Sequence, residues 1–252
     1  HYDEVVKDAT CRLLTYALNG NADFMGDDIH YASNHDFVGI EFSIHGMLDG
    51  RVRVGMPGKF NADNALAALA VCTLALSGGS GVLDDHTKQA ILGSLVKVRV
   101  DGRMEIAHVS KKCSVIVDYA HNAVSMESLL TTLRDYHPKR LVCVFGCGGN
   151  RARDRRYSMG EIGGKMADLC IITADNPRFE KNEDIIKDIE VGLAKTDGTY
   201  LVIPDRREAI FYAIRNAEEG DMIAIIGKGH EDYQEIEGVK HHFLDREVVE
   251  EA

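Results

Sequence analysis

The sequence lacks the long apolar run that a membrane span requires. No stretch of the 252 residues approaches the roughly 20 consecutive apolar positions of a transmembrane helix. An excess of positive charge is also lacking, because 29 Lys and Arg stand against 40 Asp and Glu, a net charge of −11 at pH 7. We therefore expect neither a membrane protein nor a broad surface for nucleic acid or anionic lipid, although a local basic pocket for phosphates stays open.

The closely paired cysteine spacing of a zinc site is absent as well. The six cysteines lie mostly inside apolar runs, and Cys143 and Cys147 fall within one predicted strand. That arrangement does not match the ligand spacing of a zinc site. We expect buried, reduced thiols in a cytoplasmic protein.

Two glycine-rich nucleotide-binding signatures are incomplete. Gly-Lys pairs occur at 58–59, 164–165 and 227–228, but none is followed by Ser or Thr in a complete P-loop. The stretch GCGGN at 146–150 does not complete G-x-G-x-x-G, so a dinucleotide-binding role would rest on analogy of fold alone. Its glycines either let the backbone approach a ligand closely or permit a tight turn.

From residue 113 onward, apolar strands alternate with helical segments. The expected strands cover 113–120, 140–147, 168–175, 199–204 and 221–229, and the expected helices cover 122–136, 156–167, 182–194 and 205–217. Asn182 and Asp205 are the expected N-caps of the last two helices. Continuous apolar strands between helices indicate a parallel sheet covered on both faces. Right-handed crossovers then predict an α/β fold with a Rossmann-like, doubly wound, mostly parallel sheet.

Residues 1–98 have a different pattern, and we place a domain boundary there, between domains 1–98 and 99–252. The expected elements are a β-hairpin, two helices and a linker that leads into a strand, at 37–56, 61–76, 85–94 and 97–106. Because the chain enters an element almost at once and without an initiator methionine, we expect it to be part of a longer protein.

Ligands of doubly wound sheets bind beyond the carboxyl ends of the strands. Four polar or glycine-rich stretches directly follow predicted strands there: DYAHN (118–122), GCGGNR (146–151), DNPR (175–178) and GKGHE (227–231). A purely structural domain does not need four such loops at one edge. Asp118 can accept hydrogen bonds from ribose hydroxyls and His121 can contact a phosphate or a base, while a helix N-cap and an exposed histidine are the structural alternatives.

These stretches occur in the order and spacing of the Mur ligases. The motifs that resemble the family are GRME (102–105), DYAHN, VFGCGGNR (144–151), DNPR, DRREAI (205–210), GKGHE with YQ (227–234) and FLDRE (243–247). GKFNADNALAAL (58–69) is similar to the helix that ends the family's central ATPase domain. No single motif is specific, but together they span most of the chain. It resembles the back of the central α/β domain followed by a complete C-terminal domain.

The resemblance implies an ATP-dependent amide-bond ligase of peptidoglycan precursor synthesis, with ATP and Mg²⁺ as cofactors. It is closest to the branch that adds meso-diaminopimelate to UDP-MurNAc-L-Ala-D-Glu through an acyl phosphate. Residues 1–98 would then end the ATP-binding domain, and 99–252 would bind the incoming amino acid. The family's uridine-binding domain, P-loop and magnesium-binding carbamylated lysine come before residue 1 in that order. We therefore expect no catalytic or metal-ligating residue in this chain and no activity of the chain alone.

Carried over residue by residue, the resemblance assigns two groups of side chains. The nucleotide group is Asn64, Arg103, Asp118 and His121. The group for the incoming amino acid is Arg151, Asp175, Asn176, Pro177, Arg178, Gly227 and Glu231. The guanidinium of Arg178 would pair bidentately with the second carboxylate of meso-diaminopimelate, since such charge-assisted contacts are strong. Glu231 would accept from the distal ammonium.

Three alternatives stay open. A lysine-adding or other Mur-type ligase is one, although Arg178 would then face the ammonium of lysine without a partner. A non-catalytic nucleotide- or amino-acid-binding module is the second, and a Rossmann dehydrogenase, disfavoured by the broken glycine signature, is the third. The expected partners are small molecules (UDP-MurNAc-dipeptide, meso-diaminopimelate and ATP), with no nucleic acid and no membrane.

Overall fold

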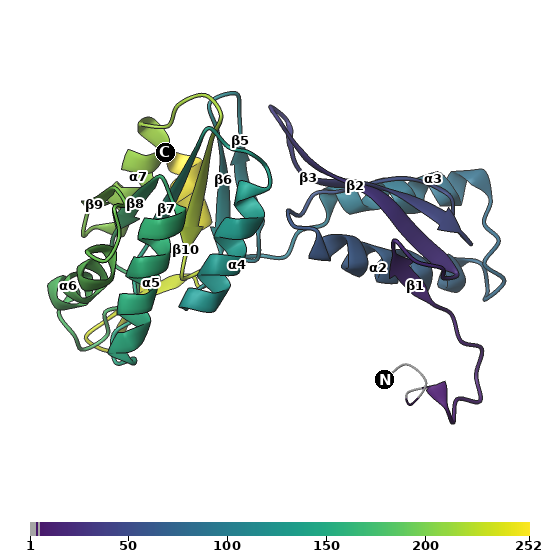
Figure 1. Ribbon diagram of the computed structural model, residues 1–252, viewed down its shortest axis with the longest axis horizontal. Helices are drawn as coiled ribbons and strands as arrows, with labels where there is room; N and C mark the ends of the chain where they lie inside the picture. The colour runs from purple at the N-terminus through teal and green to yellow at the C-terminus, as the bar shows by residue number, and fades with distance from the viewer. Residues whose placement is uncertain (1–3, 5) are drawn as a thin grey trace. The chain divides into compact units, whose positions relative to one another are not determined.

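The computed structural model describes residue 4 and residues 6–252, which divide into two compact units (Figure 1). One unit comprises the chain up to Ala32 together with Gly39–Val98, and the other comprises Ser33–Val38 together with Arg99–Ala252. Each unit has an apolar core of its own. In the part of the chain that the structure describes, no helix is both long and apolar enough to cross a bilayer.

The first unit packs a four-stranded sheet, in the order β1-β2-β3-β4, against two helices. Alternate side chains of β3, from Ile40 to Ile44, point to the same face of the sheet and are fully buried. Leu66 and Leu69 of α2 lie in the same core. The elements are β1 (Tyr16–Leu18), β2 (Phe24–Asn34), β3 (Phe37–Gly46), β4 (Gly50–Val54), α2 (Phe60–Leu76), α3 (Asp85–Ser94) and a 3₁₀ turn at Leu95–Lys97.

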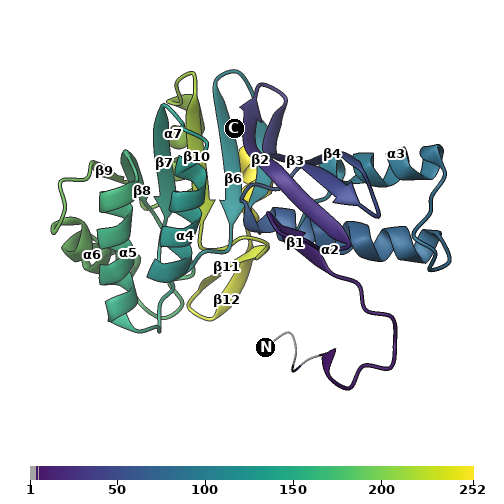
Figure 2. The same ribbon diagram turned by 45° about the vertical axis from the view of Figure 1, so that its right-hand side comes forward.

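The second unit is built on a six-stranded sheet in the order β5-β6-β10-β7-β8-β9. All neighbours pair in parallel except β5, which runs antiparallel to β6 at one edge. The strands are β5 (Glu105–Val109), β6 (Cys113–Asp118), β7 (Arg140–Phe145), β8 (Leu169–Ile172), β9 (Tyr200–Val202) and β10 (Asp221–Ile226). A separate antiparallel hairpin of β11 (Tyr233–Ile236) and β12 (Val239–His242) lies beyond the carboxyl ends of the parallel strands (Figure 2).

Helices cover both faces of this sheet, because its strands bury side chains on both sides. In β10, Met222 and Ala224 belong to one apolar cluster, while Ile223 and Ile225 belong to another. The first cluster includes side chains of α4, α5 and α6, and the second includes side chains of α7 and α8. These helices are α4 (Ala123–Arg134), α5 (Arg153–Met166), α6 (Asn182–Leu193), α7 (Arg206–Arg215) and α8 (Asp245–Glu251).

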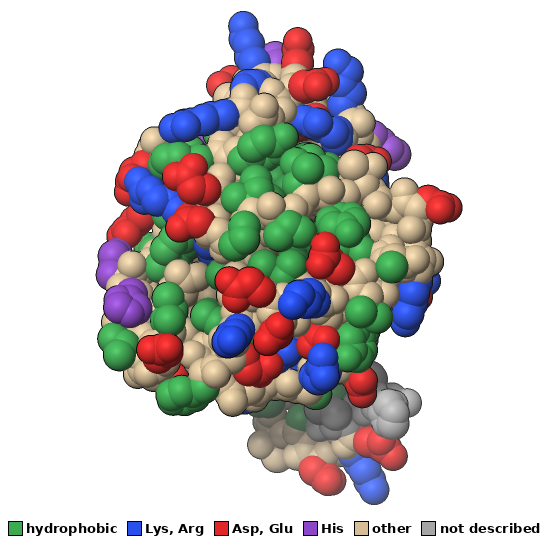
Figure 3. Space-filling view, turned by 90° about the vertical axis from the view of Figure 1, so that its left-hand side faces the viewer, with side chains coloured by type: hydrophobic (Ala, Val, Ile, Leu, Met, Phe, Trp, Pro, Cys, Tyr) green, Lys and Arg blue, Asp and Glu red, His purple; other side chains and the backbone are tan. Residues whose placement is uncertain are grey.

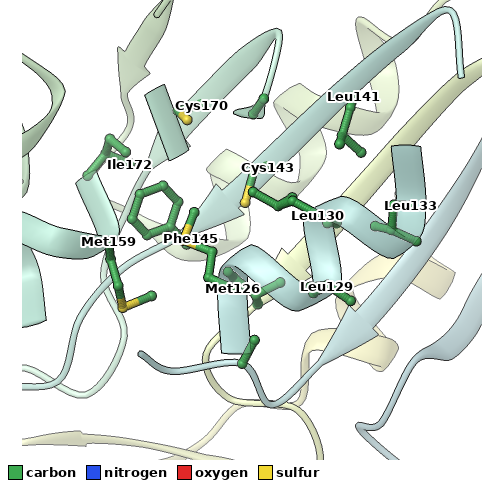
Figure 4. Packing of buried hydrophobic residues seen from close by; sticks show 14 of the residues in the cluster. Met126, Leu129, Leu130, Leu133, Leu141, Cys143, Phe145, Met159, Cys170 and Ile172 are labelled. Carbon is green, nitrogen blue, oxygen red and sulfur yellow. The ribbon is translucent and has the colours of Figure 1, made fainter. Parts of the chain in front are cut away.

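Helix α4 shows how the helical layer is formed. Its four buried side chains, Met126, Leu129, Leu130 and Leu133, recur at helical spacing and make one apolar stripe. Figure 4 shows this stripe packed against β7. The stripe holds the helix on the sheet, and the Asn122 side chain caps its first turn by accepting from Ser125 N.

Strand β9 is the open edge of the sheet. Its three residues, Tyr200, Leu201 and Val202, are 38%, 37% and 39% exposed. On the face of the second unit seen in Figure 3, apolar side chains gather among charged ones. Because β9 pairs only with β8 among the described strands, the sheet ends here.

The predicted fold class is confirmed, since the second unit is an α/β layer with a doubly wound, mostly parallel sheet. Every strand and helix expected after residue 113 is present, and Asp205 caps α7 by accepting from Glu208 N at 2.9 Å. The prediction of Asn182 as an N-cap is wrong. Lys181 occupies the cap position, and Asn182 is already helical, with its Oδ1 buried and without a hydrogen-bond partner among the described residues.

Candidate functional site

A cleft of about 490 Å³ opens at the carboxyl ends of the parallel strands of the second unit. Its wall includes seven residues that the sequence had assigned to a site: His121, Arg151, Asp175, Asn176, Arg178, Gly227 and Glu231. Arg103, Asp118 and Pro177 lie in the same unit but not on this wall, and Asn64 belongs to the first unit. The cleft therefore gathers the residues assigned to the amino acid, with one from the nucleotide group.

The loop after β7 packs directly on the loop after β8. Gly149 N donates to the carbonyl oxygen of Asn176 at 2.9 Å, and a Cβ on Gly149 would lie 1.9 Å from Pro177 O. Any side chain at position 149 would push the two loops apart. Of the two roles that the sequence left open for these glycines, Gly149 serves close packing between loops.

Asn176 is 2% exposed and connects three segments of the site. Its Nδ2 donates to Glu231 Oε2 at 2.8 Å, and its Oδ1 accepts from Glu235 N at 2.9 Å. Lys228 Nζ lies 3.4 Å from the same Oδ1. Because both ends of the amide are engaged, Asn176 fixes the carboxylate of Glu231 at the cleft wall.

Arg178 has a left-handed backbone, with φ at +54°, which a non-glycine residue adopts only when its surroundings hold it. Two hydrogen bonds do so, one to β11 and one to the residue that follows it: Arg178 N donates to Glu235 O at 3.0 Å, and Glu237 N donates to Arg178 O at 2.7 Å. Its side chain donates from Nη1 to Gly149 O at 2.9 Å, and its Nε lies 3.3 Å from Glu235 Oε2. Nη2 forms no hydrogen bond within residues 6–252, so part of the guanidinium remains available.

The cleft wall carries more positive than negative charge. Besides Arg178 it includes Arg151 and Arg155, neither of which forms an ion pair with a described residue. Its carboxylates are those of Glu231 and the buried Asp175. Guanidinium groups suit planar anions such as carboxylates, so this wall favours an anionic ligand group.

Asp175 supports the wall from beneath. Its Oδ1 accepts from Asn176 N at 2.6 Å, and a Cβ on Gly227 would lie 2.5 Å from its Oδ2. Burial raises the pKa of Asp175, against the opposing effect of the nearby cations Arg206 and Lys228. Lys228 is itself fully buried and donates to Tyr233 O, and burial lowers its pKa.

Asp118, assigned to the nucleotide, is 9% exposed and already has backbone partners. Its Oδ2 accepts from Met104 N and its Oδ1 from Ala120 N, both at 2.7 Å. Burial raises the pKa of this carboxyl, while the two hydrogen bonds oppose the shift. The carboxylate therefore organises the turn before β5 and the loop after β6.

Tyr119 joins the nucleotide group to the amino-acid group. Its hydroxyl donates to Glu231 Oε1 at 3.3 Å, and its ring lies 5.0 Å from the guanidinium carbon of Arg103. His121, which is exposed, has its Nδ1 2.9 Å from Tyr119 O. Burial and the neighbouring Glu231 raise the pKa of Tyr119.

Asn64 is an exposed residue of α2 in the first unit. Its Nδ2 donates to Asn61 Oδ1 at 3.1 Å, and Asn61 in turn donates from Nδ2 to Pro57 O at 2.7 Å. The Asn64 carbonyl oxygen of the side chain has no partner among the described residues.

Sequence reasoning missed two residues that hold the site, Tyr119 and Glu235, and a third that links its loops. Glu180 Oε1 accepts from Asn150 N and from Arg156 Nη2, the latter at 2.7 Å. The only sequence signal for Glu180 was its place two residues after Arg178. No three His, Cys, Asp or Glu side chains gather into a possible metal site within the described part of the chain.

Two family models match this chain. Residues 102–229 match the model of the Mur ligase glutamate ligase domain, and residues 1–72 match the model of the Mur ligase middle domain. The first match covers the whole parallel sheet and all four loops of the cleft up to Gly229.

Curated relatives and solved structures match over nearly the whole chain. UDP-N-acetylmuramoyl-L-alanyl-D-glutamate--2,6-diaminopimelate ligase 2 of Clostridium acetobutylicum is 40% identical over 250 residues, 98% of this chain and 49% of the relative. The corresponding ligase of Clostridioides difficile is 41% identical over 249 residues, 99% of this chain and 49% of the relative. A solved structure of a ligase of that name has a TM-score of 0.74 at 34% identity, covering 99% of this chain and 49% of that one. The chain spans about half the length of the curated relatives it matches.

Proposed function

The chain belongs to the Mur ligase family, and we propose that it is the amino-acid-binding part of an ATP-dependent ligase that joins meso-diaminopimelate to UDP-MurNAc-L-Ala-D-Glu. The observation that carries the proposal is the cleft at the strand ends, where Arg178 offers part of its guanidinium beside a fixed Glu231. A cation and an anion side by side fit a zwitterionic ligand group.

The substrate has such a group at its far end. meso-Diaminopimelate carries a carboxylate and an ammonium at each end, whereas L-lysine has only an ammonium at the end of its side chain. We assign the distal carboxylate to Arg178 with Arg151, and the distal ammonium to Glu231, which Asn176 and Tyr119 hold in place. Pro177 does not line the cleft and would support its wall. Asp175 and Gly227 do line it, and Asp175 accepts from Asn176 N and packs against Gly227, so we propose that these two residues shape the wall.

Of the four residues that the resemblance assigns to the nucleotide, the structure favours direct contact for three. We propose that Arg103 and His121 contact ATP through their exposed cationic or polar groups, and that Asn64 contacts it through its free carbonyl oxygen. Asp118 would act indirectly, since both of its oxygens accept from backbone N–H groups. Its contribution is then to hold the backbone at Met104 and Ala120.

The proposed reaction has two steps. A carboxylate oxygen of UDP-MurNAc-L-Ala-D-Glu takes the γ-phosphoryl group of ATP, which releases ADP and forms an acyl phosphate. The amine of meso-diaminopimelate then attacks the acyl carbon, loses a proton and expels inorganic phosphate. We assign no step to a metal held by this chain, whose described residues contain no group of three His, Cys, Asp or Glu side chains that could hold one.

A lysine-adding ligase is disfavoured by the same wall. The ammonium of lysine would face three guanidinium groups, those of Arg178, Arg151 and Arg155, against two carboxylates, those of Glu231 and the buried Asp175. Like charges at short range in a partly desolvated site cost affinity. The charge of the cleft therefore favours the substrate with the additional carboxylate.

A ligation assay tests the proposal. The full-length enzyme is incubated with UDP-MurNAc-L-Ala-D-Glu, ATP and either meso-diaminopimelate or L-lysine, and the product is identified by its mass. We expect ATP-dependent formation of the diaminopimelate product, and much less of the lysine product. The 252-residue chain alone should form neither. Binding of ATP or diaminopimelate without any product from the full-length protein would instead support a non-catalytic module.

A further inference from the structure

Glu235 of β11 contacts two of the three polar residues of the DNPR loop, Asn176 and Arg178. Its backbone N donates to Asn176 Oδ1 at 2.9 Å, and its backbone O accepts from Arg178 N at 3.0 Å. Its carboxylate Oε2 lies 3.3 Å from Arg178 Nε, and the two side chains are 22% and 20% exposed. No other described residue contacts this loop through its N–H, its carbonyl and its side chain together.

The contact between the Glu235 carboxylate and the Arg178 guanidinium restricts the rotamers of Arg178. An arginine side chain has many rotamers, and a ligand that must fix them loses affinity to the entropy of ordering. Gly149 O engages Nη1 and Glu235 engages Nε, so two of the three nitrogens of the guanidinium are held. Arg178 lines the cleft, whereas Glu235 does not.

We propose that Glu235 is a positioning residue, whose carboxylate sets the guanidinium of Arg178 for the distal carboxylate of the incoming amino acid. The proposal rests on the function proposed above. Glu235 does not itself touch the ligand and acts only through Arg178. Glu235 lies in β11, which pairs with β12, so the hairpin forms part of the site although most of it lies outside the cleft.

Steady-state kinetics of the full-length enzyme test this role. Glu235→Gln keeps the size and the backbone contacts but removes the charge. We expect it to raise the KM for meso-diaminopimelate about threefold to tenfold, the range of coupling between contacting side chains, with kcat and the KM for ATP unchanged. In an Arg178→Ala background, Glu235→Gln should not raise the KM for meso-diaminopimelate further, because Glu235 acts only through Arg178. Glu247→Gln is the matched control, since its carboxylate pairs with His242 of β12 at an exposed position.

Each other result overturns the inference. An unchanged KM in Glu235→Gln, beside a raised one in Arg178→Ala, refutes the positioning role and leaves the proposed function standing. A lowered KM would make Glu235 a competitor for Arg178. An equal effect of Glu235→Gln with and without Arg178 would show that it acts on folding, which the melting temperature of each variant also reports. If Arg178→Ala itself leaves diaminopimelate use unchanged, the proposed function fails together with the inference.

Discussion

The two groups of residues that we propose bind the amino acid and the nucleotide are held differently. In the amino-acid group, Asn176 is buried, and Arg178 is held by hydrogen bonds from two other segments. In the nucleotide group, Arg103 and His121 are exposed, and the side chain of each contacts Tyr119. The more firmly held residues are therefore the ones that we propose distinguish meso-diaminopimelate from L-lysine.

A side chain that distinguishes two similar ligands must be held in one position, whereas a cation that binds phosphate groups need not be. A carboxylate is bound bidentately only if the guanidinium lies in the right plane, and that geometry has to exist before the ligand arrives. Phosphate groups accept from many directions, so an exposed, mobile cation can still bind them. The predictions that follow test this contrast, starting with the support beneath the amino-acid group.

The largest effect is expected at the buried ion pair of Arg206 and Asp245, both fully buried with Nη2 2.7 Å from Oδ2. Arg206 also donates to Ala174 O and Ile226 O, at the ends of two strands that lead into the cleft. Asp245→Ala leaves a buried charge without its partner and should lower the free energy of unfolding by about 3–5 kcal/mol.

Urea denaturation measures this change. Glu250→Ala is the control, because its pair with Arg246 is exposed and should contribute less than about 1 kcal/mol. A loss at Asp245 no larger than that of the control would contradict the account of a rigid support.

The second largest effect is expected on the KM for meso-diaminopimelate when Arg178 is replaced by Ala in the full-length enzyme. Loss of a desolvated bidentate ion pair should cost roughly 2–5 kcal/mol, so the KM for meso-diaminopimelate should rise on the order of 30-fold to several thousand-fold. The KM for ATP should change little, and the poor use of L-lysine should stay the same or improve. A solvated loop residue would instead cost under about 0.5 kcal/mol with every substrate.

A smaller effect is expected at Asp118, in the nucleotide group. Asp118→Ala removes the acceptor of two N–H groups, at Met104 and Ala120, and should lower the free energy of unfolding by about 1–3 kcal/mol. It should also raise the KM for ATP without changing the choice of amino acid. Kinetics with ATP and with meso-diaminopimelate check this, and a change confined to the amino-acid constant would show that Asp118 belongs to the other group.

The smallest effect concerns the outer strand of the hairpin. Glu247 accepts from His242, which raises the pKa of that histidine above its ordinary 6.5. A folded pKa above the unfolded one gives stabilisation that is present below the ordinary value and is lost as the pH rises through the raised value. The melting temperature of wild type should therefore exceed that of Glu247→Gln at about pH 6 but not at about pH 9. An equal difference at both pH values would rule out this linkage.

The sequence was sufficient for the parallel sheet, because apolar strands and helices alternate with clear periodicity, as in the stripe of Met126 to Leu133. The loops at the strand ends followed from the topology and the shared motifs. The hairpin of β11 and β12 was not predicted, since β11 is only partly buried, β12 is exposed, and neither strand carries an apolar alternation.

Contacts between distant segments could not be predicted either. The partners of the Asp118 carboxylate depend on a left-handed turn at Met104, with φ at +44°. Gly149 needs to be glycine because of Pro177 in another loop, and Glu235 reaches Arg178 only because β11 pairs with the DNPR loop. Such contacts depend on tertiary structure, which periodicity and spacing do not specify.

The most direct test of the central claim is a crystal structure of the full-length enzyme with meso-diaminopimelate bound. Our account predicts that the distal carboxylate lies within about 3 Å of the Arg178 guanidinium nitrogens, and that the distal ammonium lies within hydrogen-bond distance of Glu231. A complex in which the distal carboxylate points to solvent, while Arg178 still contacts only Gly149 and Glu235, would contradict it.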